Sequence, residues 1–150
     1  MKQVDVAVGV VLRDSSALSS LNALNPSNAH TISRQFFICR RNASQHQGNK
    51  WEFPGGKVDA GESPLFALKR ELKEEINIEV VSAEPLIVIN FDYPDKKVCL
   101  HVFLVDKFSG EAIGAEGQES LWVDAKNLST YTFPDANVAI LDVLSKRNYI

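Results

Sequence analysis

The most constraining feature of this sequence is one strongly patterned segment, WEFPGGKVDAGESPLFALKRELKEEINI, which spans residues 51–78. A Pro-Gly-Gly turn precedes a helix signal, because Ser63 can cap the first turn and Pro64 suits the first helical position. Asn77 tolerates left-handed backbone and predicts where this helix ends. Apolar residues recur at three- and four-residue spacing and predict a buried stripe formed by Leu65, Leu68, Leu72 and Ile76.

The same helix carries three glutamates on one face. Glu71, Glu74 and Glu75 stand at positions i, i+3 and i+4, so their carboxylates gather beside the apolar stripe. Clustered carboxylates repel one another unless a cation lies between them, and oxygen ligands of this kind suit Mg²⁺. The helix alone leaves two interpretations open. One is a metal site, and the other is a solvated face with weak pairs to Lys69 and Lys73.

Composition limits the classes of partner. The chain has 150 residues, 45% of them hydrophobic, which suits one domain with a substantial core. A net charge of −3 argues against a broad basic surface and a stable nucleic-acid partner, so a polyphosphate would need metal ions or focused basic side chains. There is no membrane-span signal and no signal-peptide pattern, which predicts a cytoplasmic protein. Cys39 and Cys99 lie in apolar segments and are expected as buried, reduced thiols.

The remaining sequence predicts several strands and one further helix, and therefore an α+β domain over residues 1–150. Apolar, β-branched runs predict strands over 4–12, 35–41, 84–93, 97–108 and 119–125. The Pro-Asp-Lys turn at 94–96 joins two of these strands as a hairpin. A helix is expected over 135–147, after Pro134. Residues 14–34 are rich in Ser, Asn and Ala and predict a long loop with room for a short helical turn.

Residues 56–78 resemble the Nudix box. That motif has a Gly, a Glu six residues later, and an Arg-Glu-apolar-x-Glu-Glu cluster beginning eight residues after that Glu. The matching residues are Gly56, Glu62, Arg70, Glu71, Leu72, Glu74, Glu75 and Ile78. One position differs, because the family usually has Gly where this chain has Asn77, and both residues accept positive φ. VAVGVVL, RR, FDYPDKKVCLHVFLV, EGQESLWV and FPDAN follow the order found in the MutT branch of the family.

The resemblance implies a fold and an activity. The fold would be the Nudix fold, a mixed β-sheet sandwiched between helices, with residues 14–34 as an insertion in the first hairpin. The activity would be Mg²⁺-dependent hydrolysis of a nucleoside triphosphate to the monophosphate and pyrophosphate, with Mn²⁺ as an alternative metal. The leading substrate would be 8-oxo-dGTP, in nucleotide-pool sanitation by a monomer. Alternatives are another nucleotide such as CTP or dCTP, or a catalytically silent nucleotide-binding regulatory module.

The resemblance also implies roles for individual residues in catalysis. Metal ligands would be the Gly55 carbonyl and the carboxylates of Glu71, Glu74, Glu75 and Glu116. Both Glu71 and Glu116 are candidates for the general base. Arg70 would point away from the metal face and would orient Glu62 through a charged hydrogen bond. For Glu116 the alternative is an exposed loop side chain.

Further residues would contact the nucleotide, again by resemblance: Arg41, His46, Glu52, Phe53, Pro54, Gly55, Lys57, Lys96 and Asn137. For His46 and Lys57 the alternative is a solvated side chain, and for Phe53 it is core packing. Lys96 stands where the MutT branch has Arg. Because Lys neither stacks nor binds in a bidentate manner as Arg does, the oxidised base would be held less tightly.

Asn137 is the residue from which a base preference follows. Its carboxamide offers one acceptor and a two-hydrogen donor. Guanine presents two acceptors, O6 and N7, on its Hoogsteen edge, whereas oxidation to 8-oxoguanine places a hydrogen on N7. An acceptor left facing an acceptor costs about 1–3 kcal/mol when buried, so Asn137 would favour the oxidised base. The alternative is a helix-capping or solvent-exposed Asn.

Overall fold

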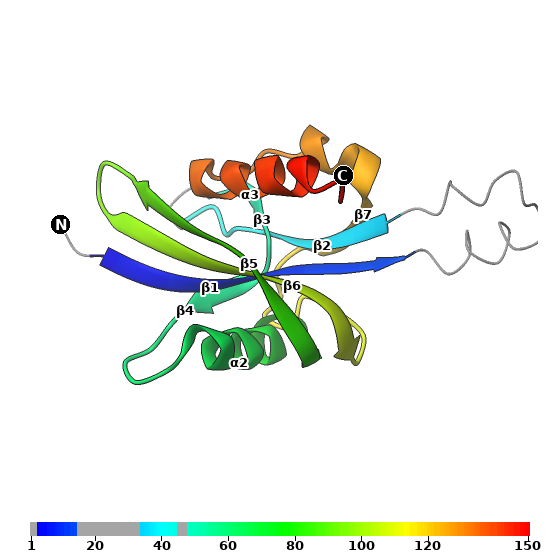
Figure 1. Ribbon diagram of the computed structural model, residues 1–150, viewed down its shortest axis with the longest axis horizontal. Helices are drawn as coiled ribbons and strands as arrows, with labels where there is room; N and C mark the ends of the chain where they lie inside the picture. The colour runs from blue at the N-terminus through cyan, green and yellow to red at the C-terminus, as the bar shows by residue number, and fades with distance from the viewer. Residues whose placement is uncertain (1–2, 15–33, 45–47) are drawn as a thin grey trace, which may run out of the picture.

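The computed structural model describes residues 3–14, 34–44 and 48–150 (Figure 1). Within these ranges the chain forms one seven-stranded mixed sheet with the order β3-β2-β1-β6-β5, while β4 pairs with β1 and β7 pairs with β2. The strands are β1 (Gln3–Asp14), β2 (Arg34–Arg40), β3 (Trp51–Glu52), β4 (Gly55–Lys57), β5 (Glu79–Asp92), β6 (Lys97–Ser109) and β7 (Ser120–Asp124).

Helices lie on both faces of this sheet. Helix α2 (Pro64–Ile76) covers one face, and α3 (Asp135–Lys146) covers the other, with the 3₁₀-helix η2 (Ala125–Thr130) preceding α3 (Figure 1). The expected α+β architecture, a mixed sheet sandwiched between helices, is therefore confirmed. In the described ranges, no helix is both long enough and apolar enough to cross a bilayer.

Strand β1 is the central element of the sheet. It pairs in parallel with β6 over nine consecutive residue pairs and in antiparallel fashion with β2 and β4. Successive strand residues face opposite sides, so β1 contributes to two separate cores. Val8 and Val10 pack on the α3 side, whereas Ala7 and Val11 pack on the α2 side. Side chains facing α3 also reach the functional pocket described below.

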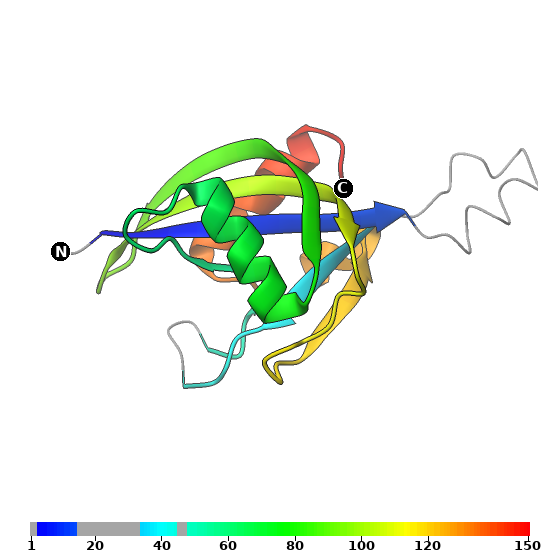
Figure 2. The same ribbon diagram turned by 90° about the horizontal axis from the view of Figure 1, so that it is seen from below.

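Both ends of α2 form as the sequence predicts. Ser63 Oγ accepts a hydrogen bond from the Phe66 N–H at 3.1 Å, and Pro64 is the first helical residue. Asn77 ends the helix in the left-handed region, with φ 61° and ψ 36°. The helix crosses β1 closely (Figure 2), and a Cβ on Gly9 would lie only 2.8 Å from Leu72 Cδ1. A glycine at this point of β1 therefore lets helix and sheet approach.

The predicted apolar stripe of α2 is correct at three of its four positions. Leu68, Leu72 and Ile76 are fully buried, but Leu65 is 39% exposed and belongs to neither core. Ala67 is buried instead. Helical periodicity gives the direction in which a side chain points, but it does not tell where the covered part of the sheet ends. That is why the first turn was assigned incorrectly.

Most other elements lie close to their predicted positions, but β5 begins at Glu79, five residues before the predicted strand over 84–93. Strands β5 and β6 form the expected hairpin, closed by hydrogen bonds from Tyr93 N to Lys96 O at 2.8 Å and from Lys96 N to Tyr93 O at 3.3 Å. Both cysteines are buried and free of disulfides. The two- and three-residue strands β3 and β4 and the helix η2 are not predicted, because such short elements carry no period.

Two sequence expectations fall largely outside the described ranges. The predicted insertion at 14–34 includes residues 15–33, which are not described, and His46 is also outside the described residues. At the edges of the insertion, Asp14 pairs with Arg34 in the antiparallel ladder of β1 and β2. The segment thus connects the two arms of a hairpin, as the resemblance implies.

Candidate active site

A pocket of about 690 Å³ lies between β1, β4, β6, the end of α2 and the start of α3. Its floor is made of alternate apolar residues from the two strands that pair in parallel: Val4, Val6, Val8, Val98 and Leu100. Carboxylates gather at the α2 end of the pocket, and an aromatic and amide surface lies at the α3 end. The two ends have distinct chemistry and are described in turn.

The acidic end combines carboxylates from three different elements. Glu71 and Glu75 come from α2, Glu52 from β3 and Glu116 from the loop that follows β6. Glu75 is only 8% exposed, and its Oε2 accepts a hydrogen bond from the Gly55 N–H at 3.0 Å. Burial raises the pKa of Glu75, and with the nearby charge of Glu52 it brings this pKa to about 8. Bringing negative charge to this point is therefore costly without a cation.

The two glycines of the turn allow β4 to lie against its neighbours. A Cβ on Gly55 would lie 2.0 Å from the Ala7 carbonyl oxygen. A Cβ on Gly56 would lie 2.3 Å from the Glu71 carboxylate. No side chain fits at Gly55, because it would clash with the backbone of β1, whereas a side chain at Gly56 would displace the Glu71 carboxylate. The Gly-Gly pair thus makes room for the backbone of β1 and for the Glu71 carboxylate.

Arg70 organises the carboxylates around it. Its Nε and Nη2 donate to the two Glu62 oxygens at 2.7 and 2.8 Å, so the predicted pairing with Glu62 is confirmed. These bonds, with one from the Asp59 N–H, lower the pKa of Glu62 to about 2. The prediction that Arg70 points away from the metal face was wrong. Its Nη1 donates to Glu71 Oε1 at 2.8 Å and approaches Glu74 Oε2 at 3.4 Å, because the long side chain reaches back across the helix.

The three box carboxylates are held separately. Arg70 fixes Glu71, the Gly55 N–H fixes Glu75, and Glu74 is 55% exposed in its side chain and does not line the pocket. In the part of the chain that the structure describes, no three carboxylates of this end have ligand oxygens within 4.8 Å of one another. Burial raises the pKa of Glu71, whereas the Arg70 guanidinium opposes this effect.

Glu116 reaches the pocket because its loop is fastened to the end of α2. The Ala115 N–H and the Gln118 side-chain amide both donate to the Glu75 carbonyl at 2.9 Å. Ile113 N donates to the Ile76 carbonyl at 3.0 Å, so the last carbonyls of the helix have partners. Gln118 Oε1 also accepts from the Glu116 N–H at 2.9 Å. The loop thereby adds Glu116 to the other three carboxylates of the acidic end.

The α3 end of the pocket presents a buried carboxamide. Asn137 lies in the first turn of α3 and is only 9% exposed. Its Oδ1 has no hydrogen-bond partner among the described residues. The residue at the N-cap position, Pro134, provides no side-chain cap, Asn137 makes no capping hydrogen bond among the described residues, and it is not exposed, so the alternative of a capping or solvated Asn was wrong. An acceptor buried in this way is costly unless a ligand donor completes it.

Aromatic side chains support the same end. The Tyr93 hydroxyl accepts a hydrogen bond from the Ala136 N–H at 3.0 Å and so takes the place of a cap at the start of α3. Phe53 is buried, lines the pocket and stacks on Phe133 with ring centroids 5.4 Å apart. Phe53 therefore belongs both to the core and to the pocket wall, and its two suggested roles are compatible.

Basic residues lie around the pocket. Arg41, Lys57 and Lys96 all line it, as the resemblance implies. Arg41 forms an ion pair with Glu52, and both side chains are about four-fifths covered. Pro54 does not line the pocket. It is buried, and its carbonyl accepts a hydrogen bond from the Gly9 N–H at 2.8 Å.

Sequence reasoning missed several lining residues, including Tyr93, Gln118, Arg40 and the apolar floor. Tyr93 could have been found, because it closes the same turn as Lys96. For Gln118 the only sequence signal is weaker, namely its position two residues after the predicted site residue Glu116. The floor valines alternate along β1, but only the pairing of β1 with β6 shows which face becomes a pocket.

The acidic end suits a divalent metal ion. Its donors are carboxylate oxygens, which hard cations such as Mg²⁺ prefer. The space above Gly56 admits the Glu71 carboxylate, and no basic side chain is hydrogen-bonded to the buried Glu75 within the described residues. A divalent cation would therefore supply the positive charge that Glu75, Glu71 and Glu116 lack at this point.

Fold and site together define a Nudix domain. A family model described as NUDIX domain matches residues 29–143, and the chain belongs to this family. Nudix hydrolases generally use divalent metal ions, in agreement with the carboxylate donors of the pocket.

Individual relatives narrow the class. The 8-oxo-dGTP diphosphatase of Haemophilus influenzae is 44% identical over 107 residues, covering 71% of this chain and 79% of the relative. The 8-oxo-dGTP diphosphatase of Escherichia coli is 32% identical over 146 residues, covering 97% and 99%. A CTP pyrophosphohydrolase of Escherichia coli is 28% identical over 142 residues, covering 95% and 91%. These enzymes hydrolyse phosphoanhydride bonds, so the predicted enzyme class is confirmed.

A solved structure supports the same branch. It comes from a study of MutT from Aliivibrio salmonicida and Vibrio cholerae, and it resembles this chain with a TM-score of 0.73 at 33% identity. The match covers 97% of this chain and 99% of the other. The predicted resemblance to the MutT branch is therefore confirmed.

Proposed function

We propose that this protein hydrolyses 8-oxo-dGTP to 8-oxo-dGMP and pyrophosphate with Mg²⁺, and so removes an oxidised nucleotide from the pool. The observation that carries the proposal is the buried Asn137 Oδ1, which lines the pocket and lacks a partner among the described residues. It requires a donor from the ligand, and the N7–H of 8-oxoguanine is such a donor. Unmodified guanine has an acceptor there and would leave both atoms unsatisfied.

The rest of the pocket accommodates the nucleotide. Phe53 and the valine floor offer apolar surface to the base, and Arg41, Lys57 and Lys96 offer positive charge to the sugar and phosphates. Glu71, Glu74, Glu75, Glu116 and the Gly55 carbonyl would hold the metal ion. Bound there, a divalent cation supplies charge neutralisation of the phosphates and a lowered pKa for water. Arg70 orients Glu71 and favours its ionised form against the effect of burial, with Glu62 as the anchor of the guanidinium.

Glu71 and Glu116 differ as candidates for the general base. Glu71 is restrained by the Arg70 guanidinium, which stabilises its ionised form. The Glu116 carboxylate makes no hydrogen bond or ion pair with the described residues. We therefore propose Glu116 as the group that takes the proton of the attacking water. Glu116→Gln should lower kcat with little change in Mg²⁺ affinity, whereas a retained kcat in this variant would assign the role to Glu71.

A nucleotide panel tests the proposed substrate. Steady-state kcat/KM would be measured with Mg²⁺ for 8-oxo-dGTP, dGTP, CTP and dCTP, with pyrophosphate release as the readout. A site that reads one hydrogen bond from the substrate discriminates by several orders of magnitude in favourable cases, on the order of 10⁴. Equal turnover of 8-oxo-dGTP and dGTP would refute the proposed specificity and leave the hydrolase intact.

The same panel addresses the alternatives. Similarity to a relative named CTP pyrophosphohydrolase makes a cytosine nucleotide the alternative substrate of this chain. The highest kcat/KM for CTP or dCTP would establish that substrate. A silent regulatory module is disfavoured because every carboxylate of the Nudix box is present. It would be supported only if nucleotide binding occurred without release of pyrophosphate.

A further inference from the structure

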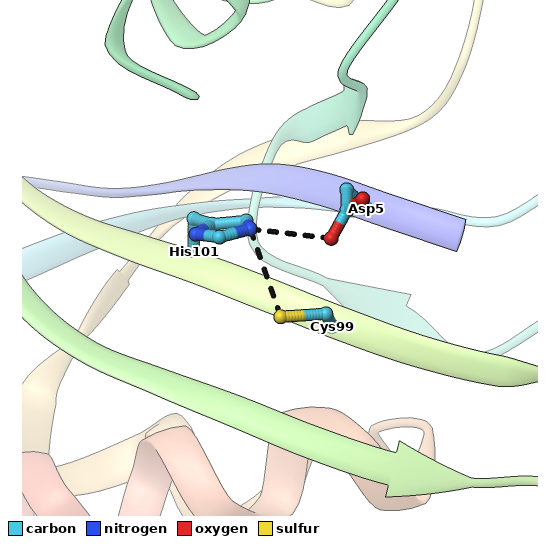
Figure 3. A group of neighbouring side chains, drawn as sticks. All are labelled: Asp5, Cys99 and His101. Atoms are coloured by element: carbon cyan, nitrogen blue, oxygen red, sulfur yellow. Dashed lines mark hydrogen bonds and ion pairs between the residues drawn. The ribbon is translucent and has the colours of Figure 1, made fainter. Parts of the chain in front are cut away.

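We propose that Asp5, Cys99 and His101 form a second metal site, for a transition-metal dication of the Zn²⁺ type, on the sheet face opposite the nucleotide pocket. Figure 3 shows the three side chains converging above strands β1 and β6. The Nudix box supplies none of these residues, and none of them lines the pocket. The inference is independent of the proposed nucleotide specificity.

Strand pairing brings the three side chains to one place. Cys99 and His101 are two residues apart on β6, so they share a face. Asp5 on β1 is the direct partner of Cys99 in the parallel ladder. The neighbouring residues Val4, Val6, Val98 and Leu100 alternate with the cluster along the two strands and line the pocket on the other side. The position is thus fixed by the backbone of the two central strands.

Two of the three donor-atom distances match tetrahedral coordination. His101 Nε2 lies 3.6 Å from Cys99 Sγ and 3.4 Å from Asp5 Oδ1, and all three ligand atoms lie within 4.8 Å of one another. In a tetrahedral Zn²⁺ site the usual bond lengths place sulfur and nitrogen ligands about 3.5 Å apart, and nitrogen and oxygen ligands about 3.3 Å apart. These preformed distances would need little adjustment.

The three side chains converge on one small space. One imidazole nitrogen, Nε2, faces both the carboxylate and the sulfur (Figure 3), and the Cys99 thiol also interacts with the Asp5 carboxylate. A cation at the point where the three atoms converge would satisfy all of them together. In the described part of the chain, this is the one group of three such side chains with ligand atoms this close.

The donor set selects the class of metal. Sulfur and imidazole ligands favour Zn²⁺ and similar transition-metal dications over Mg²⁺, which prefers oxygen ligands. Burial and the nearby Asp5 carboxylate raise the pKa of the Cys99 thiol, so the metal must displace its proton on binding. One proton would leave Sγ for each ion bound. Since Asp5 is 45% exposed in its side chain, a water molecule can complete the fourth position.

A metal here would hold β1 and β6 together directly behind the pocket floor. Both strands place their alternate residues in that floor, so the proposed ion would stabilise the ladder without touching the nucleotide. A metal that binds only the folded chain raises its melting temperature, and the stabilisation grows with the logarithm of metal concentration relative to Kd. The site is therefore expected to be structural.

Cobalt titration of the full chain in excess Mg²⁺ tests the proposal, because Mg²⁺ occupies carboxylate sites and thiolate-bound Co²⁺ has a sulfur-to-metal charge-transfer absorption. We expect that absorption to saturate at one Co²⁺ per chain and to disappear on addition of Zn²⁺. Cys99→Ser should abolish it. Asp5→Asn should weaken Zn²⁺ binding at least about tenfold, since even partners of metal ligands are worth 10- to 100-fold.

Cys39→Ala is the matched control, because Cys39 is the other buried thiol and lies outside the cluster. It should keep the absorption. Zn²⁺ should raise the melting temperature of the wild type and of Cys39→Ala, but not of Cys99→Ser. Absence of the absorption in the wild type, or its persistence in Cys99→Ser, would overturn the proposal. If Cys99→Ser fails to fold, the near-isosteric Asp5→Asn decides, because unchanged Zn²⁺ affinity in that variant also overturns it.

Discussion

The two ends of the pocket are built in different ways. The α2 end carries several charges, and its helix is capped by Ser63, the residue directly before it. The α3 end carries one neutral carboxamide, and its helix begins without a side-chain cap of its own. There the Tyr93 hydroxyl, from the distant β5–β6 turn, accepts the Ala136 N–H. The helix start at the end proposed for chemistry is thus specified locally, whereas the helix start at the end proposed for base recognition depends on tertiary structure.

The largest effect is expected from removing charge at the α2 end. Glu75→Gln keeps the shape of the side chain but loses a charge proposed to bind the metal. We expect kcat to fall by roughly 10²–10³-fold, because a bound cation stabilises the charge of such transition states by several kcal/mol. Pyrophosphate release at saturating Mg²⁺ measures this. Glu79→Gln is the control, since Glu79 is exposed and pairs only with Lys73. An equal loss in both variants would refute a specific role for Glu75.

The pH dependence of stability should also distinguish the α2 end. The pKa of Glu75 is about 8 in the folded protein, against an ordinary value of 4.5. Between these values the folded chain holds a proton that the unfolded chain has released. The metal-free protein should therefore lose stability as pH rises from 4.5 through 8, by at most about 1.4 kcal/mol per pH unit.

Urea unfolding in a chelator between pH 5 and pH 9 measures this effect. Glu75→Gln cannot titrate and should show a flatter profile, with higher stability than the wild type at pH 9. Added Mg²⁺ should stabilise the wild type more strongly as pH rises, because the ionised carboxylate binds the metal. Parallel profiles for the two proteins would contradict the raised pKa.

At the α3 end, Asn137→Ala should change selectivity more than catalysis. Loss of the carboxamide should lower the preference for 8-oxo-dGTP over dGTP by about 10- to 100-fold, which corresponds to 1–3 kcal/mol for an unsatisfied buried group. The ratio of kcat/KM for the two nucleotides is the measurement. Asn127→Ala, at an exposed position of η2, is the control and should leave this ratio unchanged.

The smallest effect should come from the contact that positions Asn137. Tyr93→Phe removes the hydroxyl that accepts the Ala136 N–H and should lower the free energy of unfolding by about 1 kcal/mol. Selectivity should fall severalfold, because the first turn of α3 loosens. Tyr131→Phe, whose ring also packs against the core, is the control. Unchanged selectivity in Tyr93→Phe would show that Asn137 is positioned without this hydrogen bond.

Much of α2 could be predicted from sequence because its determinants are local. Ser63, Pro64 and Asn77 lie within a few residues of the backbone groups that they control, and the Glu71–Glu75 spacing is a helical spacing. Leu65 was misplaced because its exposure depends on where the sheet ends. Arg70 was misdirected because the reach of a long side chain does not follow from its helical position.

The α3 end of the pocket, proposed for base recognition, was harder to predict from the sequence. The start of α3, which carries Asn137, is held by the Tyr93 hydroxyl from the hairpin turn, and the pocket floor depends on the pairing of β1 with β6. The Asp5–Cys99–His101 cluster arises from the same pairing. No local pattern in the sequence joins residue 5 to residues 99 and 101, and so the cluster had no signal before the strands were aligned.

The parallel ladder between β1 and β6 has a consequence for the order of folding. Gln3 pairs with Lys97 and Val11 with Val105, so the most amino-terminal strand waits for most of the polypeptide to be synthesised before it gains this neighbour. Contacts so distant along the chain slow folding, because a long loop must close before they form. During translation, the emerging β1 would expose an apolar edge, and this strand is where chaperone dependence of the nascent chain should be greatest.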